Sequence, residues 1–220
     1  MRIVERVREL NLVPYLVIFY MVGIIGLKIP YTYELFKVLV PFNLLLNFLL
    51  LVIYHGRITT GFIWKALVVF MAGLLVELAG VNTGAIFGSY EYGPTLGPKV
   101  FHTPVIIGLN WLMLIYASLV ISSRFLETPY FRAVIAAVIM VVYDFALEPS
   151  AIQLDMWNWG GAVPMQNYLA WLVISFILAL FADRTGMVNR QNKIAAPLFF
   201  VQFAFFIVLD IWMMIMGVWE

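Results

Sequence analysis

The sequence predicts an all-α, polytopic membrane protein with about seven transmembrane helices, which form a single domain over residues 1–220. Of the 220 residues 64% are hydrophobic and only 11% are charged, whereas about a quarter of the residues of a soluble domain are charged. The mean hydropathy is +0.99. The charges gather in short gaps between long apolar runs, a pattern typical of helices that cross a bilayer and are joined by small loops. We therefore expect a lipid partner, no nucleic-acid partner and no separate soluble domain.

Seven apolar segments each come close to the roughly 20 residues that cross a hydrocarbon core of about 30 Å. The stretch before the first segment is rich in Arg and Glu and has no small-residue cleavage site, which favours a retained helix over a signal peptide. Acidic residues interrupt the third, fifth and seventh segments, and the seventh begins near Pro197, a good first-turn residue. The segments cover residues 10–27, 38–54, 63–81, 104–123, 131–148, 167–182 and 197–217.

The distribution of basic residues predicts the orientation, because Lys and Arg resist translocation. A cytoplasmic N-terminus places ten of the 13 basic residues in inner loops or at inner helix ends, and leaves only Lys28, Lys37 and Lys99 outside. The two longest loops, about 82–103 and 149–166, then lie outside and are rich in Gly, Pro, Trp and Tyr. We expect a multi-pass protein of the cytoplasmic (inner) membrane. The oligomeric state stays open.

Four carboxylates lie inside the apolar segments at similar depth. A rise of about 1.5 Å per residue places Glu77, Asp144 and Asp210 about 20 Å from the inner ends of their helices. Glu148 lies about 26 Å along, and Asn110 lies about 9 Å from the outer end of its helix. An ionisable group near the bilayer centre costs at least about 2.5 kcal/mol on insertion scales, so these side chains are expected to face one another or a wet cavity.

Composition and position exclude several chemistries. The chain has no Cys and only two His, so disulfides, thiolate metal sites, iron–sulfur clusters and multi-histidine iron sites are excluded, and we expect no metal and no cofactor. Retinal binding needs a lysine deep in the last helix, but Lys193 lies at its cytoplasmic edge. Prenyl transfer needs aspartate-rich clusters on the cytoplasmic side, whereas these acids lie in the outer half.

The remaining chemistry is proton transfer to a lipid-soluble molecule. A carboxylic acid would protonate an alkene, aromatic faces would stabilise the cation, and water or a second double bond would capture it. Two carboxyls that share one proton suit this task, because repulsion keeps one protonated while the other stays ionised to accept a proton. Asp144 and Glu77 are the predicted pair, with Asp210 and Glu148 in support.

Two groups of motifs resemble a known family. The first comprises residues 77–84 (ELAGVNTG), 87–92 (FGSYEY), 96–99 (LGPK) and 103–105 (TPV), and the second comprises 144–149 (DFALEP), 157–159 (WNW) and 163–171 (VPMQNYLAW). They are similar to the signatures of the membrane carotenoid hydratases of the bacterioruberin and γ-carotene type. Two positions depart from the pattern: Glu148 replaces an expected aspartate, and His102 stands where glycine is more common.

The resemblance implies a hydro-lyase of carotenoid biosynthesis that needs no cofactor. Its substrate would be a carotenoid with an acyclic ψ-end, and water would add across the terminal C1–C2 double bond to give a tertiary 1-hydroxy carotenoid. The candidate catalytic residues are then Glu77, Asp144, Asp210 and Glu148. The candidate substrate-binding residues are Asn110, Tyr90, Tyr92, Trp111, Tyr143, Trp157, Trp159, Asn167 and Trp212.

Two other functions stay open. A membrane lycopene cyclase would share the protonation step, but a double bond instead of water would trap the cation. A proton-coupled transporter would also place acids at matched depth, although we find neither the inverted repeats nor the paired broken helices that are typical of transporters.

Overall fold

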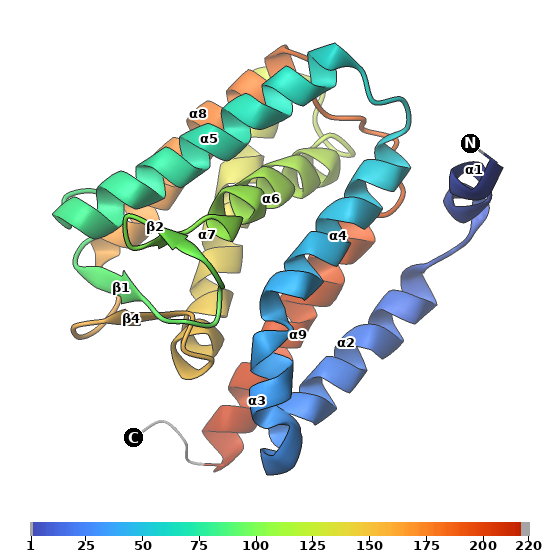
Figure 1. Cartoon of the computed structure of the whole chain (residues 1–220). Helices are drawn as coiled ribbons and strands as arrows, with labels where there is room; N and C mark the ends of the chain where they lie inside the picture. The colour runs from blue at the N-terminus through green and yellow to red at the C-terminus, as the bar shows by residue number, and fades with distance from the viewer. Residues whose placement is uncertain (1, 217–220) are drawn as a thin grey trace.

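The computed structural model describes residues 2–216, which fold into helices with two short β-ribbons on one side (Figure 1). The predicted all-α class is confirmed. The helices are α1 (Arg2–Glu9), α2 (Val13–Lys28), α3 (Pro30–Val38), α4 (Val40–His55), α5 (Thr60–Thr83), α6 (Ile106–Ser122), α7 (Pro129–Gln153), α8 (Met165–Arg184) and α9 (Ala195–Met216). The strands are β1 (Tyr90–Tyr92), β2 (Lys99–Val100), β3 (Thr103–Pro104) and β4 (Trp157–Trp159). Residue 217, the predicted end of the last segment, lies outside the described residues.

Each of the seven predicted segments overlaps a long helix, but the number of seven spans is not confirmed. Within the described residues, four helices (α5, α7, α8 and α9) are long and apolar enough to cross a membrane. The helices α3 and α4 together form a fifth candidate, which is bent by 52° at the break between them. The helices α2 and α6 are apolar but shorter. The chain is therefore a multi-pass membrane protein with four or five candidate spans.

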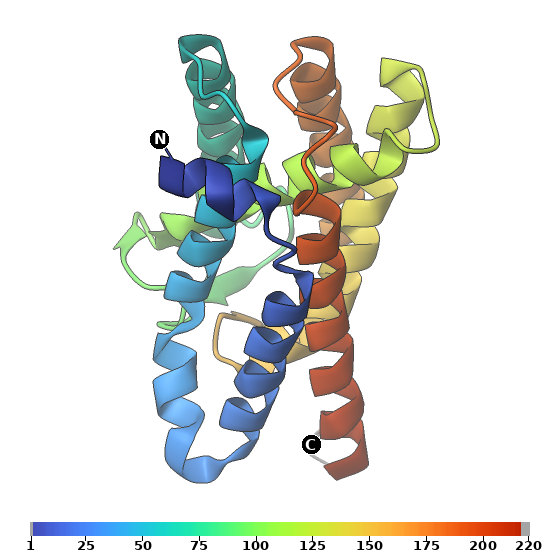
Figure 2. The same cartoon turned by 90° about the vertical axis from the view of Figure 1, so that its right-hand side faces the viewer.

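Helix α6 is the core of the bundle. Every residue of this helix except Ile106 is buried, and it contacts α4, α5, α7, α8 and α9. In Figure 2 the green helix lies across the other helices instead of along them. A helix that is apolar on all sides is one that other helices or lipid surround. The fourth predicted segment is thus packed inside protein, which the hydropathy of its sequence cannot distinguish from exposure to lipid.

Two glycines bring α5 and α6 together at the level of the candidate site. A Cβ on Gly73 would lie 2.6 Å from the Cβ of Trp111, and a Cβ on Gly108 would lie 2.8 Å from the backbone oxygen of Phe70. Such distances leave no room for a side chain. Small residues therefore set the close approach of the two helices, as is common in membrane bundles.

Helix α7 continues past the predicted end at Glu148 to Gln153, with Pro149 inside it. Proline lacks the N–H that would bond the carbonyl four residues earlier, but membrane helices tolerate it where neighbouring groups compensate. The additional turn carries Ser150 and leads into the loop before β4.

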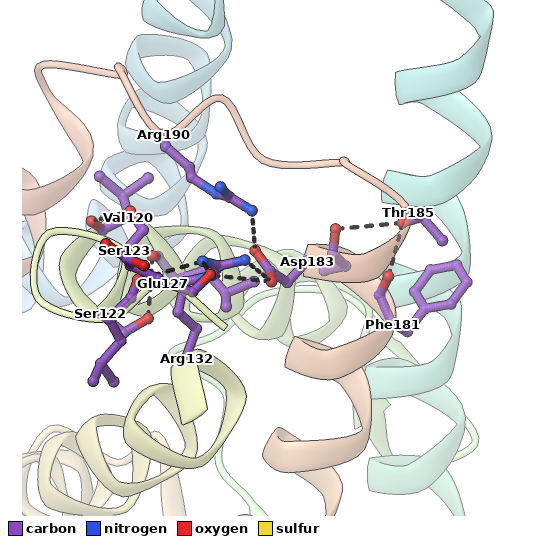
Figure 3. Close-up of polar contacts among 12 residues, drawn as sticks. Val120, Ser122, Ser123, Glu127, Arg132, Phe181, Asp183, Thr185 and Arg190 are labelled. Carbon is purple, nitrogen blue, oxygen red and sulfur yellow. Dashed lines mark hydrogen bonds and ion pairs between the residues drawn. The ribbon is translucent and has the colours of Figure 1, made fainter. Parts of the chain in front are cut away.

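The loops that we assign to the cytoplasm lie together at one end of the bundle. The Arg8 guanidinium donates to the carbonyl of Gly56 at 2.6 Å, beyond the end of α4. Figure 3 shows Arg132 and Arg190 pointing at Asp183 from α7 and from the loop after α8, with N–O distances of 2.7 and 3.0 Å. This clustering agrees with the basic-residue pattern, while the side of the membrane on which it lies stays a prediction.

Candidate active site

The two long loops that the sequence places outside pair with each other. Strands β1 and β4 are antiparallel, with Tyr90 opposite Trp159 and Tyr92 opposite Trp157. Successive side chains of a strand point to opposite faces, so the four aromatic rings share one face of the ribbon. Glu91, between the two tyrosines, points away and is exposed. The ribbon therefore presents four aromatic side chains to the ends of α5 and α7.

Glu77 on α5 is held by donors from this ribbon and from α6. The hydroxyls of Tyr90 and Tyr92 both donate to Oε2 at 2.6 Å, and the indole N–H of Trp111 donates to Oε1 at 2.9 Å. The Glu77 side chain is only 3% exposed. An ionised carboxylate only accepts hydrogen bonds, and three donors satisfy both of its oxygens.

Glu148 on α7 faces the other strand of the ribbon. The indole N–H groups of Trp157 and Trp159 both donate to its Oε2 at 2.9 Å. Each strand of the ribbon thus serves one buried carboxylate: the Tyr-x-Tyr strand holds Glu77 and the Trp-x-Trp strand holds Glu148.

Asp144 lies one turn before Glu148 on α7 and is 1% exposed. The side-chain amide of Asn167, near the start of α8, donates to its Oδ2 at 2.8 Å. Asp144 therefore has a single hydrogen-bond donor among the described residues, compared with three for Glu77.

These carboxylates surround one small space, which we call the carboxylate cavity. Its volume is about 20 Å³, and a single water needs at least about 10–15 Å³. Its lining residues are Glu77, Phe87, Tyr90, Tyr92, Ile107, Asn110, Asp144, Glu148, Trp157, Trp159, Asn167 and Trp171. None of these described residues is basic. The cavity accordingly combines three acids, aromatic walls and room for about one water.

Burial raises the pKa of Tyr90 and of Tyr92, and the neighbouring Glu77 carboxylate raises both further. Their folded pKa values lie above the ordinary value of 10.0, so both phenols keep their protons over the physiological range. They therefore remain hydrogen-bond donors to Glu77.

Aromatic rings close around the acids in pairs. Trp111 stacks on Trp171 with centroids 4.2 Å apart and an interplanar angle of 20°. Tyr90 packs on Trp159 with centroids 4.9 Å apart. Sequence reasoning missed Trp171, Phe87 and Ile107 as lining residues. The spacing of Trp171 four residues after Asn167, on one face of a helix, was the available signal for the first of them.

A second cavity, the inner apolar cavity, adjoins the first. It has a volume of about 60 Å³ and shares Ile107, Asn110 and Trp157 with the carboxylate cavity. Tyr143, which the sequence placed at the substrate site, lines this second cavity instead of the first. It packs there against phenylalanines of α9.

Two further predicted site residues, in addition to Tyr143, do not line the carboxylate cavity. The Asp210 carboxylate accepts a hydrogen bond from the Ser150 hydroxyl at 2.5 Å and lies outside the lining of the carboxylate cavity. Trp212 carries Lys28 over its ring, 4.9 Å from the centroid. The prediction used depth along each helix, and depth does not fix the face on which a side chain projects.

His102 occupies a backbone conformation that favours glycine. Its φ is +67°, and that of the preceding Phe101 is +45°. Left-handed φ values are uncommon for residues with a side chain, although histidine tolerates them better than most. This geometry explains why glycine would suit the position between β2 and β3.

A family model described as "Carotenoid biosynthesis protein" matches residues 37–219. The chain belongs to this carotenoid biosynthesis family. A curated relative, the bisanhydrobacterioruberin hydratase of Haloarcula japonica, is 30% identical over 133 residues, which cover 52% of this chain and 44% of that protein. The chain thus matches less than half the length of this relative. No solved structure matches.

The region that matches the family model contains every residue of the carboxylate cavity. The apolar helices of this family member fit a lipid environment. The resemblance to the carotenoid hydratases is confirmed by the family match and by the hydratase relative.

Proposed function

We propose that this protein is a cofactor-independent hydratase of the cytoplasmic membrane. It adds water across the terminal C1–C2 double bond of a carotenoid with an acyclic ψ-end and produces a tertiary 1-hydroxy carotenoid. The observation that carries the proposal is the carboxylate cavity, where three acids surround room for about one water and an apolar cavity shares a wall. The hydratase relative supports the same reaction class.

The reaction balances within the site. A protonated carboxyl transfers its proton to C2, and the electrons of the C1–C2 double bond form the new C2–H bond. This leaves a tertiary cation at C1. The water oxygen bonds to C1 and releases a proton to an ionised carboxylate. One carboxyl has lost a proton and another has gained one, so a proton exchange between them restores the starting state.

The hydrogen-bond partners of the three acids favour different roles: a proton-sharing pair and a stabilising anion. Asp144 and Glu148 each keep one oxygen, Oδ1 and Oε1, that receives no protein hydrogen bond within the described residues. They are one turn apart and suit a pair that shares a proton, as in other carboxyl dyads. Glu77, with donors on both oxygens, suits a permanent anion that stabilises the cation. This assignment replaces Glu77 by Glu148 in the pair that the sequence suggested.

Aromatic faces supply the second source of stabilisation. Tyr90, Trp159 and Trp171 line the cavity, and Trp111 stacks on Trp171 from behind it. Aromatic rings attract cations by about 0.5–2 kcal/mol. A tertiary carbocation carries little hydrogen-bonding capacity, so ring faces suit it better than polar groups would.

The proposed reaction can be tested by isotope labelling of the product from solvent. Purified protein in detergent, supplied only with an acyclic carotenoid such as lycopene and a metal chelator, should form the 1-hydroxy product. In deuterium oxide the product should gain one non-exchangeable deuterium at C2, and in heavy-oxygen water the label should appear in the hydroxyl at C1. Oxygen derived from dioxygen would contradict the proposal.

Other products would identify the alternatives. An isomer of unchanged mass with a new ring and a solvent deuterium would indicate a lycopene cyclase. Inertness toward carotenoids together with proton-driven uptake into vesicles would indicate a transporter.

A further inference from the structure

The carboxylate cavity alone is too small for a carotenoid end. At about 20 Å³ it accepts a water but not the branched end of an isoprenoid chain. If the proposed hydration is correct, on which this inference rests, the double bond has to reach the acids from a neighbouring space.

The inner apolar cavity is that neighbour. Ile107, Asn110 and Trp157 belong to both cavities, so a chain end in the inner apolar cavity lies against the wall of the carboxylate cavity. Elsewhere the inner apolar cavity is bordered mainly by apolar side chains, among them Leu147 of α7 and Phe206 of α9. A hydrocarbon chain carries no polar group of its own, so its burial against these apolar side chains leaves none of its atoms without a hydrogen bond.

A groove between α2 and α4 continues this space toward lipid; we call it the α2–α4 groove. Its volume is about 260 Å³. It shares five residues with the inner apolar cavity, which are Tyr20, Leu27, Val40, Asn43 and Phe205. On the side of the groove that opens away from the protein, Val22 is 51% exposed and Phe42 is 60% exposed. Figure 2 shows α2 and the α3–α4 pair as neighbouring arms joined at one end. Apolar side chains this exposed on membrane helices contact lipid tails.

A larger groove lies on the other side of α4, but it is less continuous with the site. This α4–α6 groove has a volume of about 690 Å³ and shares only Leu96 with the inner apolar cavity. Its lining also contains Glu34 and Lys37. A charged rim suits a polyene less well than the uncharged lining of the α2–α4 groove.

We propose that the polyene chain of an acyclic carotenoid reaches the site sideways from the bilayer through the α2–α4 groove. The chain lies in the groove and in the inner apolar cavity, and its terminal double bond meets the carboxylate cavity at Asn110 and Trp157. The water approaches C1 of this double bond from among the carboxylates. The polyene never has to cross an aqueous phase.

Gly23 allows a sharp test, because it lines the α2–α4 groove and carries no side chain. A Cβ there would meet only the ring of Phe205, at 3.4 Å, so a larger side chain would grow into the groove. Gly23→Phe should obstruct it. Val22→Trp is a second obstruction that needs no backbone adjustment, since Val22 is already half exposed.

Two control variants match these. Ile25→Phe places the same ring on the same helix at a position 53% exposed that does not line the groove. Leu45→Trp fills the α4–α6 groove instead. Binding is measured by the visible circular dichroism that an achiral acyclic carotenoid, lycopene, acquires when it is held by the purified protein. KM and kcat for its conversion are measured in parallel.

We expect Gly23→Phe and Val22→Trp to weaken binding and raise KM by at least about tenfold, with a smaller change in kcat, because overfilled space excludes the chain. Ile25→Phe and Leu45→Trp should stay within about twofold of wild type. A loss with Leu45→Trp alone, or no loss with folded Val22→Trp, would overturn the access route. A wild-type protein that binds lycopene through the α2–α4 groove but does not hydrate it would instead refute the proposed function.

Discussion

Replacement of Asp144 by asparagine separates the chemistry of this carboxyl from its structural contribution. Asparagine keeps the shape, and its carbonyl oxygen still accepts the Asn167 amide at the site of the present 2.8 Å hydrogen bond. It has no acidic proton to give. General acid catalysis contributes about 10²–10⁴-fold, which corresponds to about 2.7–5.5 kcal/mol of barrier. We therefore expect turnover to fall by at least about 100-fold.

Stability should change far less than the rate. The Asn167 amide keeps an acceptor, so the change at this hydrogen bond costs at most about 1 kcal/mol. Removal of a buried carboxyl that has no basic partner in its cavity offsets part of this cost. The melting temperature in detergent should thus move by only a few degrees.

Asp210→Asn is the matched control, because it makes the same chemical change on α9 outside the carboxylate cavity. Its amide oxygen can still accept the Ser150 hydroxyl. We expect its rate to stay within about threefold of wild type. Initial rates of product formation, measured by chromatography on purified proteins of equal melting temperature, decide the comparison. A folded Asp144→Asn protein with more than about a tenth of wild-type turnover, or equal losses in the two variants, would refute the reasoning.

Three further predictions concern the ribbon, the helix packing and the topology. Tyr92→Phe removes a hydrogen-bond donor to the buried Glu77 carboxylate and should lower the free energy of unfolding by about 1–3 kcal/mol. Glu91 is exposed, so Glu91→Gln should leave the melting temperature unchanged. Gly73→Ala should lower the melting temperature, although alanine favours helix by about 1 kcal/mol, because its Cβ would lie 2.6 Å from a neighbouring side chain. A reporter active only outside the cytoplasm should be active after Gly161, where an added Cβ would meet no neighbouring atom within 4 Å. The same reporter should be silent at Arg190, and the reverse result would invert the orientation.

Much of the candidate site could be predicted because the membrane penalises charge. Glu77, Asp144 and Glu148 stand out in an apolar chain, and the cost of burying each one requires partners. The structure brings these three residues together, and Asn110 and Asn167 with them. Asp210 carries the same signal but meets Ser150, because the rise per residue gives depth and not direction.

The pairing of the two loops was not predicted, although its signal lies in the sequence. Tyr90 and Tyr92 alternate with an acidic residue, and Trp157 and Trp159 alternate with an amide, which is the period of a half-buried strand. Each strand is only three residues long and is separated from its partner by more than 60 residues, so local propensity gives little weight to the pairing. The number of spans could not be predicted from the sequence either. The hydropathy of α6 is the same whether lipid or protein surrounds the helix.

The choice of donors in the carboxylate cavity has a chemical consequence. A lysine or arginine beside these acids would form an ion pair and hold the carboxyls ionised, leaving no proton to transfer. The five Tyr and Trp donors stabilise charge without supplying a full positive charge, and burial keeps the two tyrosines in their donor form. They also hold the carboxylate oxygens in position without a substrate, so the proposed reaction would need no reorganisation of these groups. An aromatic ribbon over buried acids can thus serve two steps at once, because its N–H and O–H groups orient the carboxylates while its ring faces are available to a cation.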